Sequence, residues 1–271
     1  MAKTKMLSLL YLLSLLLLMA SGSLLGALSR VAYALAFLLP TVIGIYLTCR
    51  GETGKKELPL SLDSRAAGLF IPVIFPTVLL IACASLLTST VIWLVFGVKN
   101  QVTLGDNLPL AILSHAILPA VLEEALYRYL PLRLWGRERG AGLVVISSLC
   151  FALLHRDFFV IPYAFLAGAL FMIIDIITDS IWPSVILHAV NNTLSVLLIF
   201  YSQSKEFTVG FYVTLVILSA ISAIFIFKKR DAYLQGLKKI FNGEKVKLDA
   251  EILYLAIPTL ALAAIGLASK F

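Results

Sequence analysis

Long apolar runs separated by short polar segments make up almost the whole chain. Since a helix needs about 20 apolar residues to cross the hydrocarbon core of a bilayer, each run predicts a membrane-spanning helix. The predicted spans cover residues 6–28, 31–49, 67–98, 110–134, 141–157, 158–178, 181–202, 207–228 and 251–269. The pattern therefore predicts an all-α fold, a polytopic transmembrane helical bundle of about eight to nine spans.

The composition agrees with a membrane protein. Of the 271 residues, 61% are hydrophobic and 14% are charged, against roughly 45–50% and about 25% in soluble domains. Because the apolar runs recur along the whole length, we expect a single integral membrane domain over residues 1–271. The first apolar stretch begins at Met6 and is long enough to span, so we expect it to stay as a helix and not to be removed as a signal peptide.

The net charge of +7 comes from basic residues that flank the predicted spans. They do not form one patch, so we predict no nucleic-acid partner. If the loops alternate sides from an inside N-terminus, 17 of the 22 Lys and Arg residues fall inside and five fall outside, as expected when cytoplasmic loops are enriched in basic residues. The basic segment 228–247 predicts an amphipathic helix lying on anionic lipid.

A few polar side chains interrupt the apolar helices. They are costly inside a bilayer, so either function or pairing must account for them. Counted from the inside boundary at 1.5 Å per residue, Glu123, His155 and His188 lie roughly 16, 21 and 10 Å deep. Asn192 follows His188 by four residues and shares its helix face. We therefore predict one polar layer, in or near the inside half of the bilayer, around an intramembrane cavity.

Adjacent carboxylates at Glu123 and Glu124 have different expected roles. Glu124 and Arg128 are four residues apart and can neutralise each other on one helix face. Glu123 is rotated from Glu124 by roughly 100° and is free to meet another helix. A carboxylate beside an imidazole can deprotonate water, and His and Asn donors can hold the oxyanion that forms when water adds to a carbonyl. The set therefore indicates amide hydrolysis.

Other uses of the same residues remain open. Glu123, His155 and His188 supply three ligands of the kind found in an open catalytic zinc site, although no His-Glu-x-x-His pattern accompanies them. A non-enzymatic scaffold or a proton or ion transporter could also use the polar layer, but no inverted repeat is visible. The sequence assigns no role to Asp175 and Asp179, and His115 near the outside end of its helix receives none either.

Three short motifs resemble those of the type II CAAX prenyl endopeptidases, a family of polytopic membrane glutamate proteases grouped with Abi-type proteins. Glu-Glu-x-x-x-Arg occurs at 123–128, Phe-x-x-x-His at 151–155 and His-x-x-x-Asn at 188–192. All three lie in order within the core segment 110–200. The resemblance implies that Glu123 activates the attacking water with help from His155, and that His188 and Asn192 form the oxyanion site. Supporting positions are then Glu124, Arg128 and Phe151.

The resemblance also implies the substrate and the location. The expected substrate is a prenylated, CAAX-type or other membrane-associated peptide cut near its C-terminus, and the eukaryotic members remove the last three residues after a prenylated cysteine. No cofactor is implied. The active site is expected to face the cytosol, in the cell membrane of a prokaryote or the endoplasmic reticulum of a eukaryote.

Overall fold

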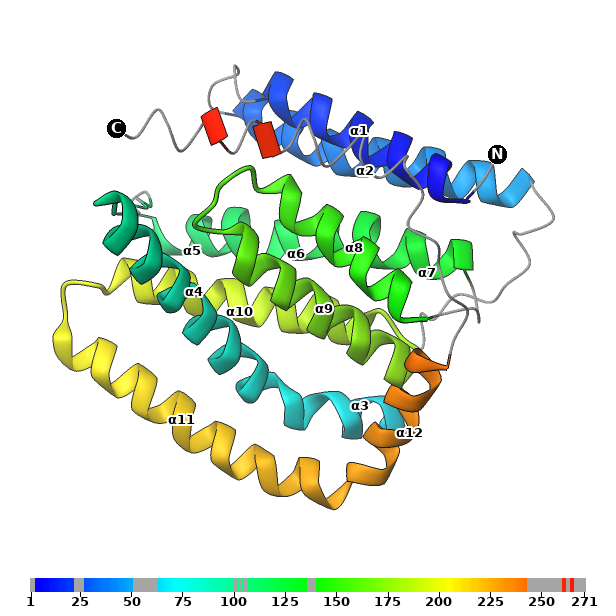
Figure 1. The fold of residues 1–271 in the computed structure, drawn as a ribbon. Coiled ribbons are helices and arrows are strands. Elements are labelled where there is room, and N and C mark those ends of the chain that lie inside the picture. Colours follow the sequence, from blue (N-terminus) through cyan, green and yellow to red (C-terminus); the bar gives the residue numbers. More distant parts are fainter. Residues whose placement is uncertain are drawn as a thin grey trace.

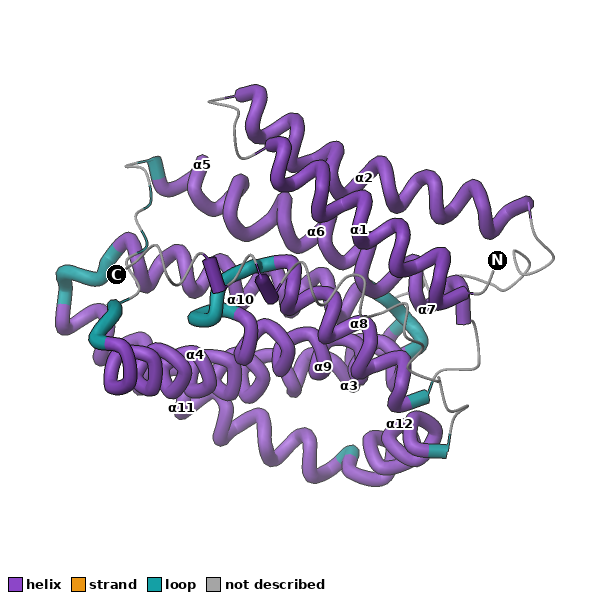
Figure 2. Tube along the Cα trace, turned by 45° about the horizontal axis from the view of Figure 1, so that its top comes forward, coloured by secondary structure: helices purple, strands orange, loops and turns teal. Residues whose placement is uncertain are grey.

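The computed structural model describes residues 3–21, 27–50, 63–99, 102, 104, 107–135, 140–242, 260, 261, 264 and 265. Every regular element within these ranges is a helix, and none of the described residues forms a strand, so the predicted all-α fold is confirmed. The long helices lie side by side with the α1–α2 pair along one side of the bundle and α11 along the other (Figure 1). Figure 2 shows the same arrangement from a second direction, with α8, α9 and α10 between these two sides.

The helices follow one another along the chain with short connections. They are α1 (Lys3–Ser21), α2 (Ala27–Arg50), α3 (Ser64–Phe70), α4 (Ile74–Phe96), α5 (Leu108–Ile112), α6 (Leu118–Glu124), α7 (Leu130–Trp135), α8 (Ala141–Leu154), α9 (Ile161–Thr178), α10 (Trp182–Phe200), α11 (Lys205–Lys228) and α12 (Arg230–Phe241). A 3₁₀ turn, Ile71–Val73, joins α3 to α4. Two π-helical turns, Leu113–Ile117 and Ala125–Tyr129, join α5, α6 and α7 into one helix over 108–135.

Six helical segments are long and apolar enough to cross a membrane. They are Leu28–Thr48, Ser64–Phe96, Leu108–Leu134, Ile161–Thr178, Trp182–Phe200 and Lys205–Lys228. Two further apolar helices, Lys5–Ala20 and Ala141–Leu154, are shorter. Each of the first eight predicted spans thus corresponds to a helix, and the chain is an integral membrane protein. The ninth predicted span, 251–269, lies outside the described residues except at four positions.

Proline shapes the helix over 108–135, because a proline has no N–H to donate one turn back. Pro131 cannot donate the α-helical hydrogen bond to the carbonyl of Tyr127, and the hydroxyl of Ser147 on α8 donates to this carbonyl. A non-helical backbone interaction of this kind is tolerated in a membrane only where neighbouring protein satisfies it. The bond therefore fixes α8 against the turn that follows Glu124.

Close approach of α9 to α8 depends on Gly168. A Cβ atom at Gly168 would lie 3.1 Å from the Cα of Ser148 and 3.2 Å from the ring of Phe151. Small residues commonly let membrane helices pack at short range in this way. This contact holds Phe151 and the end of α8 in place, where His155 follows.

The predicted amphipathic helix forms as α12. Its Gly236 and Ile240 are buried, and the hydroxyl of Tyr233 donates to the carbonyl of Leu69 on α3. Burial raises the pKa of Tyr233 to about 12, so the hydroxyl keeps its proton at neutral pH. The opposite side of the helix is exposed, and its contact with anionic lipid stays a prediction.

Candidate active site

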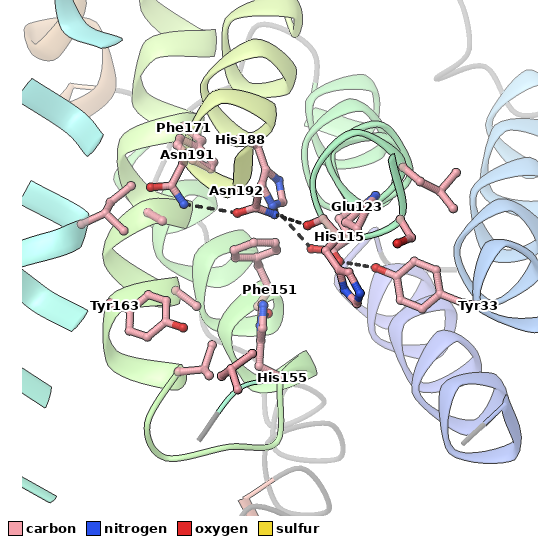
Figure 3. Close-up of a pocket in the computed structure, with 18 of the residues that line it drawn as sticks. Tyr33, His115, Glu123, Phe151, His155, Tyr163, Phe171, His188, Asn191 and Asn192 are labelled. Atoms are coloured by element: carbon pink, nitrogen blue, oxygen red, sulfur yellow. Dashed lines mark hydrogen bonds and ion pairs between the residues drawn. The ribbon is translucent and has the colours of Figure 1, made fainter. Parts of the chain in front are cut away.

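A cavity of about 820 Å³ collects most of the predicted site residues (Figure 3). Side chains from α2, α4, α8, α9, α10 and the helix over 108–135 line it. Five of the seven predicted site residues lie in this lining, namely Glu123, Phe151, His155, His188 and Asn192. The other two, Glu124 and Arg128, are fully buried behind it. The three motifs therefore meet in one place, as the helix depths predicted.

A chain of charged groups links the first motif to the third. The Nε atom of Arg128 lies 3.2 Å from Oε2 of Glu124, and neither side chain has any exposed surface. The other oxygen of Glu124, Oε1, lies 2.8 Å from Nδ1 of His188. The predicted pairing of Glu124 with Arg128 is thus observed, and the same carboxylate also orients the imidazole of His188. A carboxylate partner on one ring nitrogen fixes which nitrogen of a histidine faces the reaction.

Glu123 points away from that pair and into the cavity. Its Oε1 accepts a hydrogen bond of 2.6 Å from the hydroxyl of Tyr33 on α2, and its Oε2 lies 4.0 Å from Nε2 of His188. The side chain is buried, with 6% of the residue exposed. Glu123 therefore meets other helices, as its rotation from Glu124 predicted, and its carboxylate is held from one side by a phenol.

His155 is held by the helix that it ends. The last carbonyls of a helix have no backbone donor of their own, and Nδ1 of His155 lies 3.1 Å from the carbonyl oxygen of Phe151. Because a carbonyl can only accept, Nδ1 is the donor in this contact. The Phe-x-x-x-His spacing thus places this histidine and orients its ring.

The ring of Phe151 lies among the charged and imidazole groups of the site. Its centroid is 5.2 Å from that of His155 and 5.6 Å from that of His188, both in edge-to-face geometry. The guanidinium of Arg128 lies 4.6 Å from the centre of the same ring. Phe151 therefore separates the cavity from the buried ion pair while it contacts both.

Asn192 is placed by a second proline. Pro119 has no N–H, which leaves a carbonyl one turn earlier, that of His115, without its α-helical donor. The Nδ2 atom of Asn192 donates to that oxygen at 3.3 Å, and its Oδ1 accepts from Asn191 at 3.2 Å. One N–H of the Asn192 amide thus serves the backbone of the neighbouring helix, and its second N–H is left for the cavity.

Glu123 and His155 do not bond to each other directly in the described part of the chain. Glu123 and His155 line the same cavity, but no hydrogen bond or ion pair joins these two described residues. Among the residues that the structure describes, no group of three or more His, Cys, Asp or Glu side chains is arranged to hold a metal ion. The zinc alternative at Glu123, His155 and His188 stays a prediction.

Sequence reasoning missed several residues of the site. Tyr33 stands in an apolar run with no motif around it, and His115, Asn191 and Arg30 also line the cavity. Asp175, which received no role, is fully buried and accepts a hydrogen bond of 3.0 Å from the backbone N–H of Ser184. That N–H belongs to the first turn of α10, where donors lack helical partners, so Asp175 fixes the start of the helix that carries His188. Asp179, in a left-handed conformation, ends α9.

The exposed residues of the cavity lining lie at one end of the bundle. They are Arg30 near the start of α2, Val102 before α5, and His115 in the first half of the helix over 108–135. The described basic cluster at Arg230, Lys238 and Lys239 of α12 lies at the opposite end (Figure 1). The charge distribution predicts that the basic end faces the cytosol, and the resemblance predicts that the active site faces it. The orientation of the protein in the membrane stays a prediction.

Comparison with known families agrees with the motifs. A family model described as type II CAAX prenyl endopeptidase Rce1-like matches residues 105–194. This segment contains all three motifs, and the predicted resemblance is confirmed over it. No curated protein and no solved structure gives a significant match. Tyr33 and Arg30 lie outside the matched segment, so their place in the site comes from the structure.

Proposed function

We propose that the protein is an intramembrane endopeptidase that uses Glu123 to activate water and cleaves a prenylated, CAAX-type or other membrane-associated peptide near its C-terminus. The observation that carries the proposal is the position of Glu123. Its buried carboxylate reaches the cavity between a phenol donor and an imidazole, 2.6 Å from Tyr33 and 4.0 Å from His188. The match of residues 105–194 to the CAAX endopeptidase family supports the same chemistry.

His188 and Asn192 are the proposed donors of the oxyanion site. Nδ1 of His188 lies 2.8 Å from Oε1 of Glu124, which leaves Nε2 as the ring nitrogen nearer Glu123, 4.0 Å from its Oε2. A hydrogen on Nε2 is one donor, and the second N–H of Asn192 is another. Two such donors can stabilise the oxyanion of a tetrahedral intermediate.

The reaction follows from these positions. The carboxylate of Glu123 takes a proton from water, and the water oxygen adds to the carbonyl carbon of the peptide bond. His188 and Asn192 bind the resulting oxyanion, and His155 accepts a hydrogen bond from the attacking water at Nε2. When the carbon–nitrogen bond breaks, the proton held by Glu123 passes to the leaving amine. A single carboxyl group can act first as base and then as acid in this way.

Cleavage of a farnesylated CAAX peptide by the purified protein in detergent tests the proposal. The Glu123→Gln variant keeps an oxygen that accepts from Tyr33 but cannot take a proton, so we expect kcat to fall by about 10²–10⁴-fold. Glu206→Gln, at the exposed start of α11, is the matched control and should cleave like the wild type. Cleavage should also persist in the presence of a chelator.

Three outcomes would contradict the proposal. Equal cleavage by wild type and Glu123→Gln would remove the assigned role of the carboxylate. Loss of activity on chelation, restored by Zn²⁺, would favour the metal alternative. Failure of the wild type to cleave prenylated and unprenylated peptides would exclude the proposed substrates.

A further inference from the structure

Arg30 brings a positive charge to the mouth of the cavity. It is the single Lys or Arg among the described residues that line the cavity, and Glu123 is the single acidic one. The Arg30 side chain is exposed, and no described acidic residue forms an ion pair with it. A guanidinium of this kind is available to a ligand that enters the cavity.

The spacing of Arg30 and Tyr33 on α2 relates this charge to the reacting groups. The two residues are three apart, so they share a helix face and lie roughly 4.5 Å apart along its axis. Tyr33 contacts Glu123 directly. The guanidinium of Arg30 is therefore within a few residues of extended chain from Glu123, since three such residues span roughly 10 Å.

We propose that Arg30 binds the C-terminal carboxylate of the substrate and so limits cleavage to bonds a few residues from a free C-terminus. This inference rests on the proposed endopeptidase function. A guanidinium matches a carboxylate with two parallel N–H···O bonds, which adds direction as well as affinity. The distance between Arg30 and Glu123 then sets how many residues follow the cleaved peptide bond. This number does not depend on the apolar group that the substrate carries before that bond.

The test compares two substrates that differ only at the C-terminus. A farnesylated peptide with a free carboxylate and the same peptide with a C-terminal amide are offered to wild type, Arg30→Gln, Arg30→Lys and Lys205→Gln. Lys205 begins α11 and is not part of the described cavity lining, so its variant controls for the loss of one positive charge. We expect wild type and Lys205→Gln to prefer the acid by about 10- to 100-fold in kcat/KM.

In Arg30→Gln that preference should disappear, because cleavage of the acid should fall to about the rate at which the same variant cleaves the amide. Arg30→Lys should keep part of the preference for the acid, since an ammonium retains the positive charge but lacks the two parallel N–H donors of a guanidinium. Equal rates on acid and amide in the wild type, or an unchanged preference in Arg30→Gln, would overturn the carboxylate site while leaving the endopeptidase function intact. Loss of both reactions in Arg30→Gln would show a structural role and would also overturn it. If the wild type cleaved neither peptide, the proposed function would fail first, and this inference with it.

Discussion

Removing one partner of the buried pair between Arg128 and Glu124 should destabilise the protein strongly. Both side chains are without exposed surface, and Nε of Arg128 lies 3.2 Å from Oε2 of Glu124. Truncation of one partner in such a pair costs about 3–5 kcal/mol, because the other charge stays buried without compensation. At about 2–4 °C per kcal/mol for a chain of this size class, that loss corresponds to a decrease in Tm of about 6–20 °C.

The assay is thermal unfolding of the purified protein in detergent for four proteins: wild type, Glu124→Gln, Arg128→Met and the double variant. Each single variant should unfold well below the wild type. The double variant removes both charges and keeps similar side-chain volumes, and the Gln oxygen can still accept from Nδ1 of His188. Since a buried ion pair can often be replaced by uncharged groups at little cost, we expect its Tm within about 4 °C of the wild type.

Two results would refute this reasoning. Single variants with a wild-type Tm would show that removing one partner does not leave the other as a destabilising buried charge. A double variant as unstable as the sum of the two singles would show that the two side chains act independently, because coupled partners give non-additive effects. A Lys239→Met variant on the exposed side of α12 serves as the control for the loss of a surface charge.

Two further predictions concern the carboxylate of Glu123 and the orientation of the protein in the membrane. Tyr33→Phe removes the hydrogen bond of 2.6 Å to Glu123. Since a hydrogen bond to a charged acceptor contributes about 1.5–3 kcal/mol, kcat should fall about 10- to 100-fold with little change in KM. An unchanged kcat would contradict the positioning role of Tyr33. Single cysteines introduced at Lys239 and Val102 should react with an impermeant thiol reagent from opposite sides of the membrane. We expect the cysteine at position 239 on the cytosolic side, because basic residues are retained there. Labelling at position 239 from outside the cell would reverse this orientation and place the mouth of the cavity in the cytosol.

The sequence predicted the parts of the site that depend on spacing within one helix. Four-residue spacing placed Glu124 against Arg128, because helix geometry is local. The predicted depths also brought the three motifs to a single cavity, and the apolar runs gave eight helices at the expected places. All of these follow from the helical rise and from the cost of polar groups in a bilayer.

The rest of the site depends on how different helices face one another, which spacing does not determine. Nothing around Tyr33 in its apolar run indicates that its hydroxyl meets Glu123, and nothing around Asn192 indicates the carbonyl that it binds. Depth along a helix also does not reveal the end from which a cavity is reached. The prediction of a polar layer in the inside half of the bilayer therefore did not include the exposed lining residues Arg30, Val102 and His115.

Pro119 and Pro131 in the helix over 108–135 also bear on how the protein is assembled. Its backbone lacks donors that α8 and α10 supply, through Ser147 to the carbonyl of Tyr127 and through Asn192 to that of His115. During synthesis this helix leaves the ribosome before either partner helix. Its backbone stays incomplete until residue 192 has joined the bundle, and the same event delivers His188 to Glu124. Asn192 and His188 lie on the same helix, so the contact that serves the backbone of the helix over 108–135 and the contact that joins two motifs of the candidate site depend on the same packing of α10.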